Sequence, residues 1–107
     1  MKPILPLCLL LAAAAAPAGA VEYAYMISAG EMRGMIEQNN RPMVIGYISG
    51  VMDAQMRARE FCLPEGTKMA DVGVRAYKMM GQQPRESKAP AADVIAVYLR
   101  GDFPCSK

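Results

Sequence analysis

Apolar residues after position 20 recur every three or four places in four separate stretches, which is the spacing of amphipathic helices. We expect these helices, with their caps, over residues 28–38, 42–61, 67–81 and 90–100. No stretch of strand length alternates apolar and polar residues. The pattern therefore predicts an all-α fold, a small bundle of about four helices in a single domain.

The expected boundaries carry residue types that start and stop helices. Ser28 and Glu31 have the spacing of a capping box, in which each residue satisfies the backbone amide of the other. The pair Asn39-Asn40 should end the first helix. Thr67 is a favourable N-cap for the third helix, because its hydroxyl can accept from an amide of the first turn.

Small residues recur every four places in the second expected helix, at Gly46, Gly50, Ala54 and Ala58. Each glycine inside a helix costs about 1 kcal/mol relative to alanine, so we expect a compensating close approach of another helix. That helix belongs either to the same domain or to a second copy of the chain. Tyr47 flanks this ridge and is expected in the core. Charged residues on the same helix exclude a membrane span.

The first 20 residues read as a secretory signal peptide. Lys2 provides a positive start, residues 4–16 are apolar, and residues 18–20 are small. We expect cleavage after Ala20, which leaves one domain over residues 21–107. A membrane anchor is the alternative, but the apolar run is shorter than the ~20 residues that a span needs. The mature chain is therefore expected to be exported through the general export pathway and to meet oxidising conditions.

Two cysteines remain after cleavage, because Cys8 leaves with the leader. Cys62 and Cys105 form one candidate disulfide that closes a loop of about 43 residues, worth about 4 kcal/mol on a chain-entropy estimate. A redox-active pair is the alternative. Redox pairs favour close spacing such as Cys-x-x-Cys, so a structural role is the stronger interpretation.

Composition argues against most catalytic and nucleic-acid functions. The net charge of +2 falls to about +1 without Lys2, which provides no basic field for nucleic acid or anionic membranes. There is no histidine, so the commonest general base and zinc ligand are missing. Asp53 and Glu60 lie about 10 Å apart on one helix, too far to share a proton. We expect no enzyme activity, no catalytic residue, no cofactor and no metal.

Methionine is the one unusual count, with 10 in the whole chain. Pairs such as Met32 and Met35, or Met52 and Met56, would place two thioethers on one helix face. Thioethers suit Cu(I), so a copper carrier is one hypothesis. Methionine is also an adaptable core filler, and most of these positions fall on apolar stripes.

Four segments together resemble the Rap/Tai family, the periplasmic immunity proteins of the type VI secretion system. They are GYISGVMDA at 46–54, FCLPEG at 61–66, PAA at 90–92 and FPC at 103–105. The resemblance implies an all-α fold, a structural disulfide between Cys62 and Cys105, and frequent homodimers. It also implies that the protein neutralises a peptidoglycan amidase delivered by another cell.

In amidase-binding relatives, a loop between two helices enters the enzyme's cleft. The stretch that matches by position is residues 82–88, which is polar, lacks an apolar anchor and is expected to be exposed. The candidate partner-binding residues are therefore Gln82, Gln83, Arg85, Glu86, Ser87 and Lys88. A small acid-stress chaperone of the periplasm, or another protein-binding module, is the alternative function.

Overall fold

Four helices and no strand make up the described part of the chain, residues 26–106 of the computed structural model. The helices are α2 (Ala29–Glu37), α3 (Arg41–Arg57), α4 (Met69–Met80) and α5 (Ala91–Asp102). The predicted all-α fold of about four helices is confirmed. The predicted signal peptide and its cleavage site lie outside the described residues.

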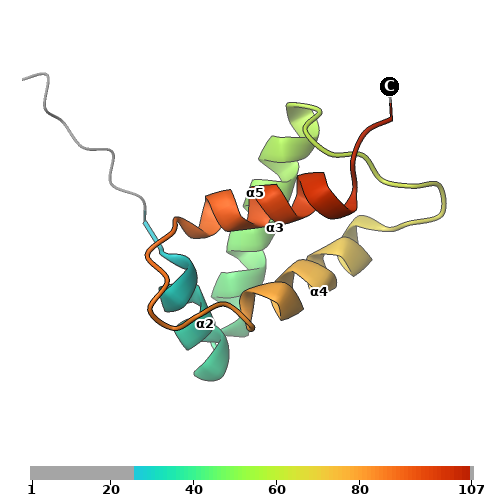
Figure 1. Ribbon diagram of the computed structural model, residues 1–107. Coiled ribbons are helices and arrows are strands. Elements are labelled where there is room, and N and C mark those ends of the chain that lie inside the picture. The colour runs from blue at the N-terminus through green and yellow to red at the C-terminus, as the bar shows by residue number, and fades with distance from the viewer. Residues whose placement is uncertain (1–25, 107) are drawn as a thin grey trace, which may run out of the picture.

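The longest helix, α3, is central to the arrangement. Helices α4 and α5 lie side by side with opposite chain directions, and both cross α3, while α2 packs at the end where α3 begins (Figure 1). Every pair of the four helices is in contact. All four therefore contribute to one hydrophobic core.

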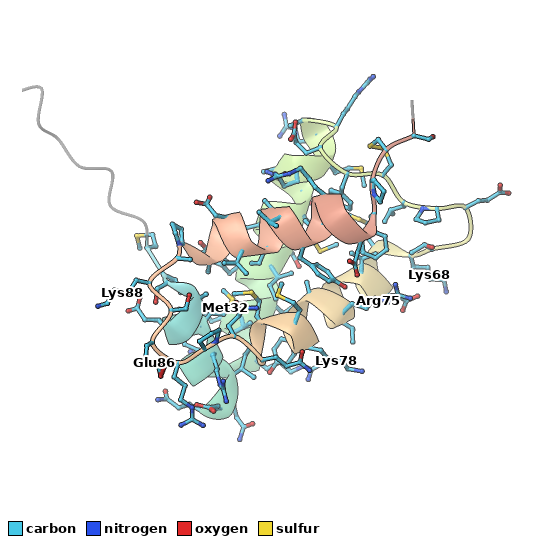
Figure 2. The ribbon with its side chains drawn as sticks, in the orientation of Figure 1. Met32, Lys68, Arg75, Lys78, Glu86 and Lys88 are labelled. Carbon is cyan, nitrogen blue, oxygen red and sulfur yellow. A yellow bond between two sulfur atoms is a disulfide. The ribbon has the colours of Figure 1, made fainter. Side chains whose placement is uncertain are left out.

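The core is built from apolar side chains that recur at helical spacing. Its largest fully buried members come from all four helices and from the segment after α3: Phe61, Met32, Ile48, Met80, Ile95, Leu99, Val44 and Val72. Met32, labelled in Figure 2, lies among the helices, and Met52 and Met80 are also buried. These methionines thus act as core fillers.

Two left-handed residues end helices α2 and α3. Asn39 has φ 61°, and the amide of Asn40 donates to the Met35 carbonyl at 2.9 Å, which closes a Schellman motif. The predicted stop at Asn39-Asn40 is confirmed. Arg59, at φ 58°, ends α3 in the same way, so the predicted end near Phe61 was too late.

The start of α4 also differs from its prediction. Thr67 is not the N-cap, because its amide donates to the Pro64 carbonyl at 3.0 Å in the preceding turn. The N-cap is Lys68, which has extended backbone angles and no side-chain capping bond. Because the preceding turn uses the Thr67 amide, α4 begins only at Met69.

The predicted disulfide between Cys62 and Cys105 is present, with the two Cα atoms 4.9 Å apart. Beside it, the Cys62 amide donates to the Phe103 carbonyl at 2.9 Å. Phe61 and Phe103 are both buried. The bond therefore fixes the segment after α3 to the tail after α5, next to two aromatic side chains of the core.

The small-residue ridge of α3 does not pack inside the domain. Gly46, Gly50 and Ala54 are exposed, and a Cβ added at either glycine would have no neighbour within 4 Å. Of the two alternatives, the structure does not support packing inside the domain, because the core-facing side of α3 carries Val44, Ile48 and Met52 instead. Packing against a second copy stays a prediction. Tyr47 is half-buried and packs against the core, as expected.

Candidate functional site

The segment between α4 and α5 contains the six predicted partner-binding residues and folds across the start of α2. It leaves α4 at Gly81, where the Gln82 amide donates to the Met79 carbonyl at 3.1 Å. It returns to the body of the protein at Pro90, which forms an isolated β-bridge with Ser28. We call residues 82–88 the α4–α5 loop.

Backbone hydrogen bonds fix the α4–α5 loop and the residues after it to the first turn of α2. The Ala29 amide donates to the Ala89 carbonyl at 2.8 Å, and the Gly30 amide donates to the Ser87 carbonyl at 3.1 Å. The first amides of a helix have no partner within the helix, so these carbonyls satisfy donors that would otherwise be left over. The loop is thus anchored by backbone groups rather than by apolar side chains.

Gly30 makes this close approach sterically feasible. A Cβ at this position would clash with the carbonyl oxygen of Arg85 and would lie 2.9 Å from that of Ser87. Gly30 is itself buried under the loop. Position 30 is therefore a residue on which the loop's conformation depends, a role that was not predicted from the sequence.

Side chains of α2 hold the first half of the loop. Arg33 donates from Nη1 to the Gln83 carbonyl at 2.7 Å, and Arg85 pairs with Glu37 at 2.7 Å. Arg33 also lies 3.4 Å from Glu37, so one carboxylate faces two guanidinium groups. These pairs are exposed and each contributes at most about 1 kcal/mol, so they position the loop more than they stabilise the fold.

The six predicted residues lie together, but they differ in exposure. Gln82, Arg85, Glu86 and Lys88 are exposed, while Gln83 and Ser87 are half-buried. The side-chain amide of Gln83 donates from Nε2 to the Met79 carbonyl at 3.3 Å. Figure 2 shows Glu86 and Lys88 at the edge of the molecule, with their side chains pointing away from the helices. The loop thus combines a fixed backbone with outward polar side chains.

A shallow hollow of about 620 Å³ lies between the loop and the start of α2. Its lining residues come from both sides: Ser28, Gly30, Glu31, Arg85, Glu86, Ser87 and Lys88. The capping box is present, since Glu31 accepts from the Ser28 amide at 2.8 Å and its own amide donates to the Ser28 hydroxyl at 3.1 Å.

Hydrogen bonds, and to a smaller extent charge, favour the ionised form of the Glu31 carboxyl beside this hollow. The hydrogen bonds from the Ser28 amide and from the Ser28 side chain lower the pKa of Glu31, and the positive charge of Lys88 adds to this shift. The hollow therefore presents a carboxylate beside cationic groups. Such a surface offers donors, acceptors and charges of both signs to a protein partner.

The part of the chain that the structure describes provides neither a metal site nor a membrane span. No three histidine, cysteine, aspartate or glutamate side chains gather there in a way that could hold a metal ion. None of the helices between residues 26 and 106 is long and apolar enough to cross a membrane.

Comparison with known proteins identifies the family. A family model described as Rap1a immunity proteins matches residues 31–105, a span that includes all four helices in whole or in large part, the disulfide and the α4–α5 loop. No curated protein and no solved structure matches the chain. Since the match extends over well more than half of the sequence, the chain belongs to the Rap1a immunity protein family.

Proposed function

We propose that this protein binds a peptidoglycan amidase, delivered by a type VI secretion system, and blocks its substrate cleft with the α4–α5 loop. Membership of an immunity family implies that a secreted effector is bound. The observation that supports the loop as the contact is its anchoring. Its charged side chains are exposed, yet the Gly30 amide and the Arg33 guanidinium fix its backbone.

A loop that is already ordered loses little conformational entropy when it binds. Immobilising side chains and loops at an interface costs affinity, and preorganisation removes part of that cost. The bonds from Ala29, Gly30 and Arg33 hold the loop before any partner arrives. A rigid loop can occupy a substrate cleft without being cleaved by the enzyme. We therefore propose a non-enzymatic inhibitor that acts by occlusion.

The exposed charges of the loop support a role in recognition. Arg85, Glu86 and Lys88 place both signs of charge within four residues. Complementary charges at the rim of an interface raise the association rate and exclude wrong partners more than they add affinity. We propose that these three side chains select the effector, while the loop backbone fills its cleft.

A second copy of this chain is the other proposed partner, on the exposed ridge of α3. Gly46, Gly50 and Ala54 form a smooth, exposed surface, and within residues 26–106 a Cβ added at either glycine would meet nothing within 4 Å. Two glycines within a helix reduce its stability, which a close helix–helix contact in a homodimer would offset. This proposal places the dimer contact on a different helix from the amidase contact.

The proposed location is the periplasm, where a cell-wall amidase would act. The Cys62–Cys105 disulfide supports it, because such bonds persist in oxidising compartments. The predicted signal peptide over residues 1–20 would provide export.

A rescue assay tests the proposed function. The product of the gene adjacent to this chain's gene would be directed to a bacterial periplasm, with and without this protein. We expect survival when this protein is present and lysis when it is absent, with peptidoglycan fragments released only in its absence. Lysis in both cases, with this protein folded and exported, would contradict immunity. Protection against a product that cleaves no peptidoglycan amide bond would contradict the choice of target.

A further inference from the structure

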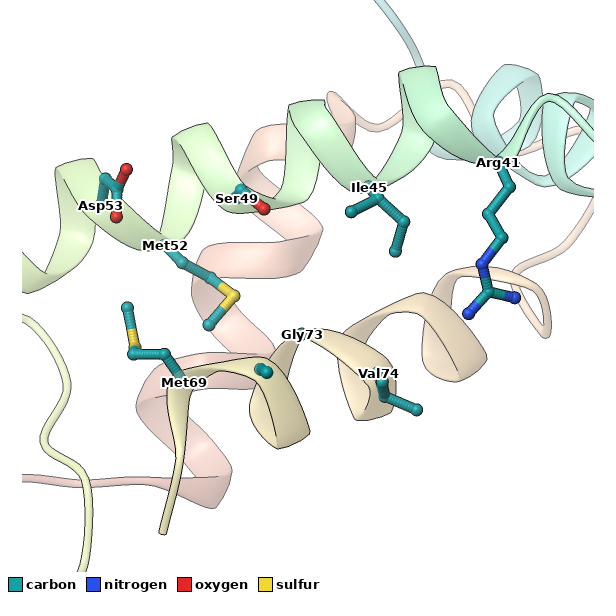
Figure 3. Close-up of a pocket in the computed structure, with 9 residues that line it drawn as sticks. Arg41, Ile45, Ser49, Met52, Asp53, Met69, Gly73 and Val74 are labelled. Atoms are coloured by element: carbon teal, nitrogen blue, oxygen red, sulfur yellow. The ribbon is translucent and has the colours of Figure 1, made fainter.

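A groove between α3 and α4 is separate from the α4–α5 loop. Its volume is about 410 Å³, within the range of about 300–1,000 Å³ that ligand pockets span. Ile45, Met52, Met69 and Val74 provide most of its apolar lining (Figure 3). Val74 is 42 % exposed, although its helix contacts all three of the others. The groove is therefore an apolar surface that the domain itself does not cover.

The shape of the groove depends on small and flexible residues. Gly73 has no side chain to fill the space, and a Cβ there would lie 3.7 Å from the Met52 sulfur. The thioether side chains of Met52 and Met69 come from opposite walls (Figure 3). Methionine adapts its shape to what it contacts, which suits a surface that receives apolar side chains.

Opposite charges mark the two ends of the groove. Arg41 stands at one end, where its guanidinium lies over the Tyr77 ring at 4.9 Å, and Asp53 stands at the other. Within residues 26–106 neither of them takes part in an ion pair. The stacking on Tyr77 uses one flat face of the guanidinium and leaves its N–H edge for a partner.

The spacing of these charges matches a short stretch of chain. Arg41 and Asp53 are 12 residues apart on α3, or about 18 Å at 1.5 Å per residue. An extended chain covers that distance in about five residues, at roughly 3.4 Å each. We infer that the α3–α4 groove binds an extended apolar segment of a protein partner, with an acidic residue at the Arg41 end and a basic residue at the Asp53 end.

The carboxylate of Asp53 favours a peptide segment over a lipid. An anionic amphiphile could pair its head group with Arg41, but its apolar tail would then end beside a carboxylate. A segment with a basic residue there meets a complementary charge at both ends. The inference does not depend on the amidase proposal, because it involves other helices and a different test.

Peptides with matched and mismatched ends test the inference. Three capped five-residue peptides share an apolar centre of leucine, valine and leucine. They end in one glutamate and one lysine, in two glutamates, or in two lysines. Each is titrated into the ¹⁵N-labelled exported protein while amide shifts are recorded. We expect shifts around Ile45 and Val74, with the mixed peptide bound two- to fivefold more tightly than either other peptide, as for exposed ion pairs.

Charge-reversal variants at either end of the groove should change which peptide binds most tightly. Arg41→Asp should shift the preference to the peptide with two lysines, and Asp53→Arg should shift it to the peptide with two glutamates. Val74→Asp should abolish the groove shifts, whereas Val97→Asp, at a 60 % exposed valine of α5, should leave them unchanged. Amide spectra of the free variants show whether each is folded.

Three results would overturn the inference. One is the absence of shifts in the groove with every peptide. Another is the same preferred peptide in the wild type and in both charge reversals. The third is groove binding by laurate, lost in Arg41→Asp but not in Asp53→Arg, with no peptide bound, which would identify a lipid site. None of these results bears on survival in the rescue assay, so the two proposals fail separately.

Discussion

Gly30 donates its backbone amide to the Ser87 carbonyl at 3.1 Å across a sequence separation of more than 50 residues. This bond joins the first turn of α2 to the segment that leads into α5. The two residues approach so closely because position 30 has no side chain. The conformation of the proposed binding loop is thus set by a residue outside it.

Replacement of Gly30 by alanine should displace the α4–α5 loop. The added Cβ would meet the carbonyl oxygens of Arg85 and Ser87, which are backbone atoms that cannot rotate away. We expect a loss of about 1–3 kcal/mol in the free energy of unfolding, as for other overpacked sites. Urea unfolding and amide exchange of the loop would measure both effects.

Gly46→Ala is the matched control, since a Cβ there meets nothing within 4 Å. It should stabilise the protein by about 0.5–1 kcal/mol through helix propensity. Equal stabilities for Gly30→Ala and the wild type, with an unaltered loop, would contradict the assigned role of Gly30.

Removal of the three loop charges should weaken effector binding without unfolding the protein. The triple change Arg85→Ala, Glu86→Ala and Lys88→Ala removes rim charges, so the association rate should fall and depend less on salt. Tm should change little, because the Arg85–Glu37 pair is exposed. Binding kinetics at two salt concentrations provide the measurement.

A second triple variant provides a control with the same change in net charge. Arg57→Ala, Glu65→Ala and Lys68→Ala all alter exposed residues outside the loop. This variant should bind like the wild type. If both triple variants lost the same affinity, the effect would come from net charge rather than from the loop.

Loss of the disulfide should cost a large share of the stability. The bond closes 43 residues of chain, for which loop entropy gives about 4 kcal/mol. The double variant Cys62→Ser and Cys105→Ser, or reduction of the wild type, should lower the urea midpoint accordingly. If reductant leaves the urea midpoint unchanged, the Cys62–Phe103 backbone hydrogen bond and the core hold the tail in place without the disulfide.

Acid should destabilise the wild type partly through Glu31. The folded-state pKa of this carboxyl lies below its ordinary value of 4.5. Its contribution to the free energy of unfolding is therefore fully present above pH 4.5. The contribution is lost as the pH falls through the lower, folded-state pKa. Glu31→Gln should therefore show a shallower fall in Tm below about pH 4.5 than the wild type. Glu65→Gln, a change of the same type in an exposed turn, should follow the wild-type curve.

Alanines at Gly46 and Gly50 should separate folding from association. Each open glycine weakens α3, so the double variant should gain about 1–2 kcal/mol in stability as a monomer. The added methyl groups would also push a second copy away from the ridge. Sedimentation equilibrium should show a weaker dimer. Unchanged association in this variant would place any dimer contact elsewhere.

Local signals predicted the helices well. The capping box at Ser28 and the stop at Asn39 depend on residues within one turn, and both are present. The end of α3 before Arg59 and the start of α4 after Lys68 were not predicted correctly. A non-glycine residue in the left-handed region carries no strong sequence signal, and the turn before α4 uses the Thr67 amide.

Long-range features were harder to predict. The anchoring of the loop depends on backbone carbonyls, which are the same for every residue type, so no side-chain pattern reveals it. A glycine in the first turn of a capped helix was the one available signal. The packing partner of the α3 ridge stayed open, because periodicity shows that small residues share a face, but not whether that face is buried.

Inhibition kinetics test the occlusion of the amidase cleft most directly. The adjacent gene's product would be assayed on a soluble stem-peptide fragment of peptidoglycan, at several concentrations of substrate and of this protein. The account predicts a rise in apparent KM with kcat unchanged, and a smaller rise at the same concentration of the triple loop variant. A fall in kcat with KM unchanged, or equal inhibition by the triple loop variant and the wild type, would contradict it.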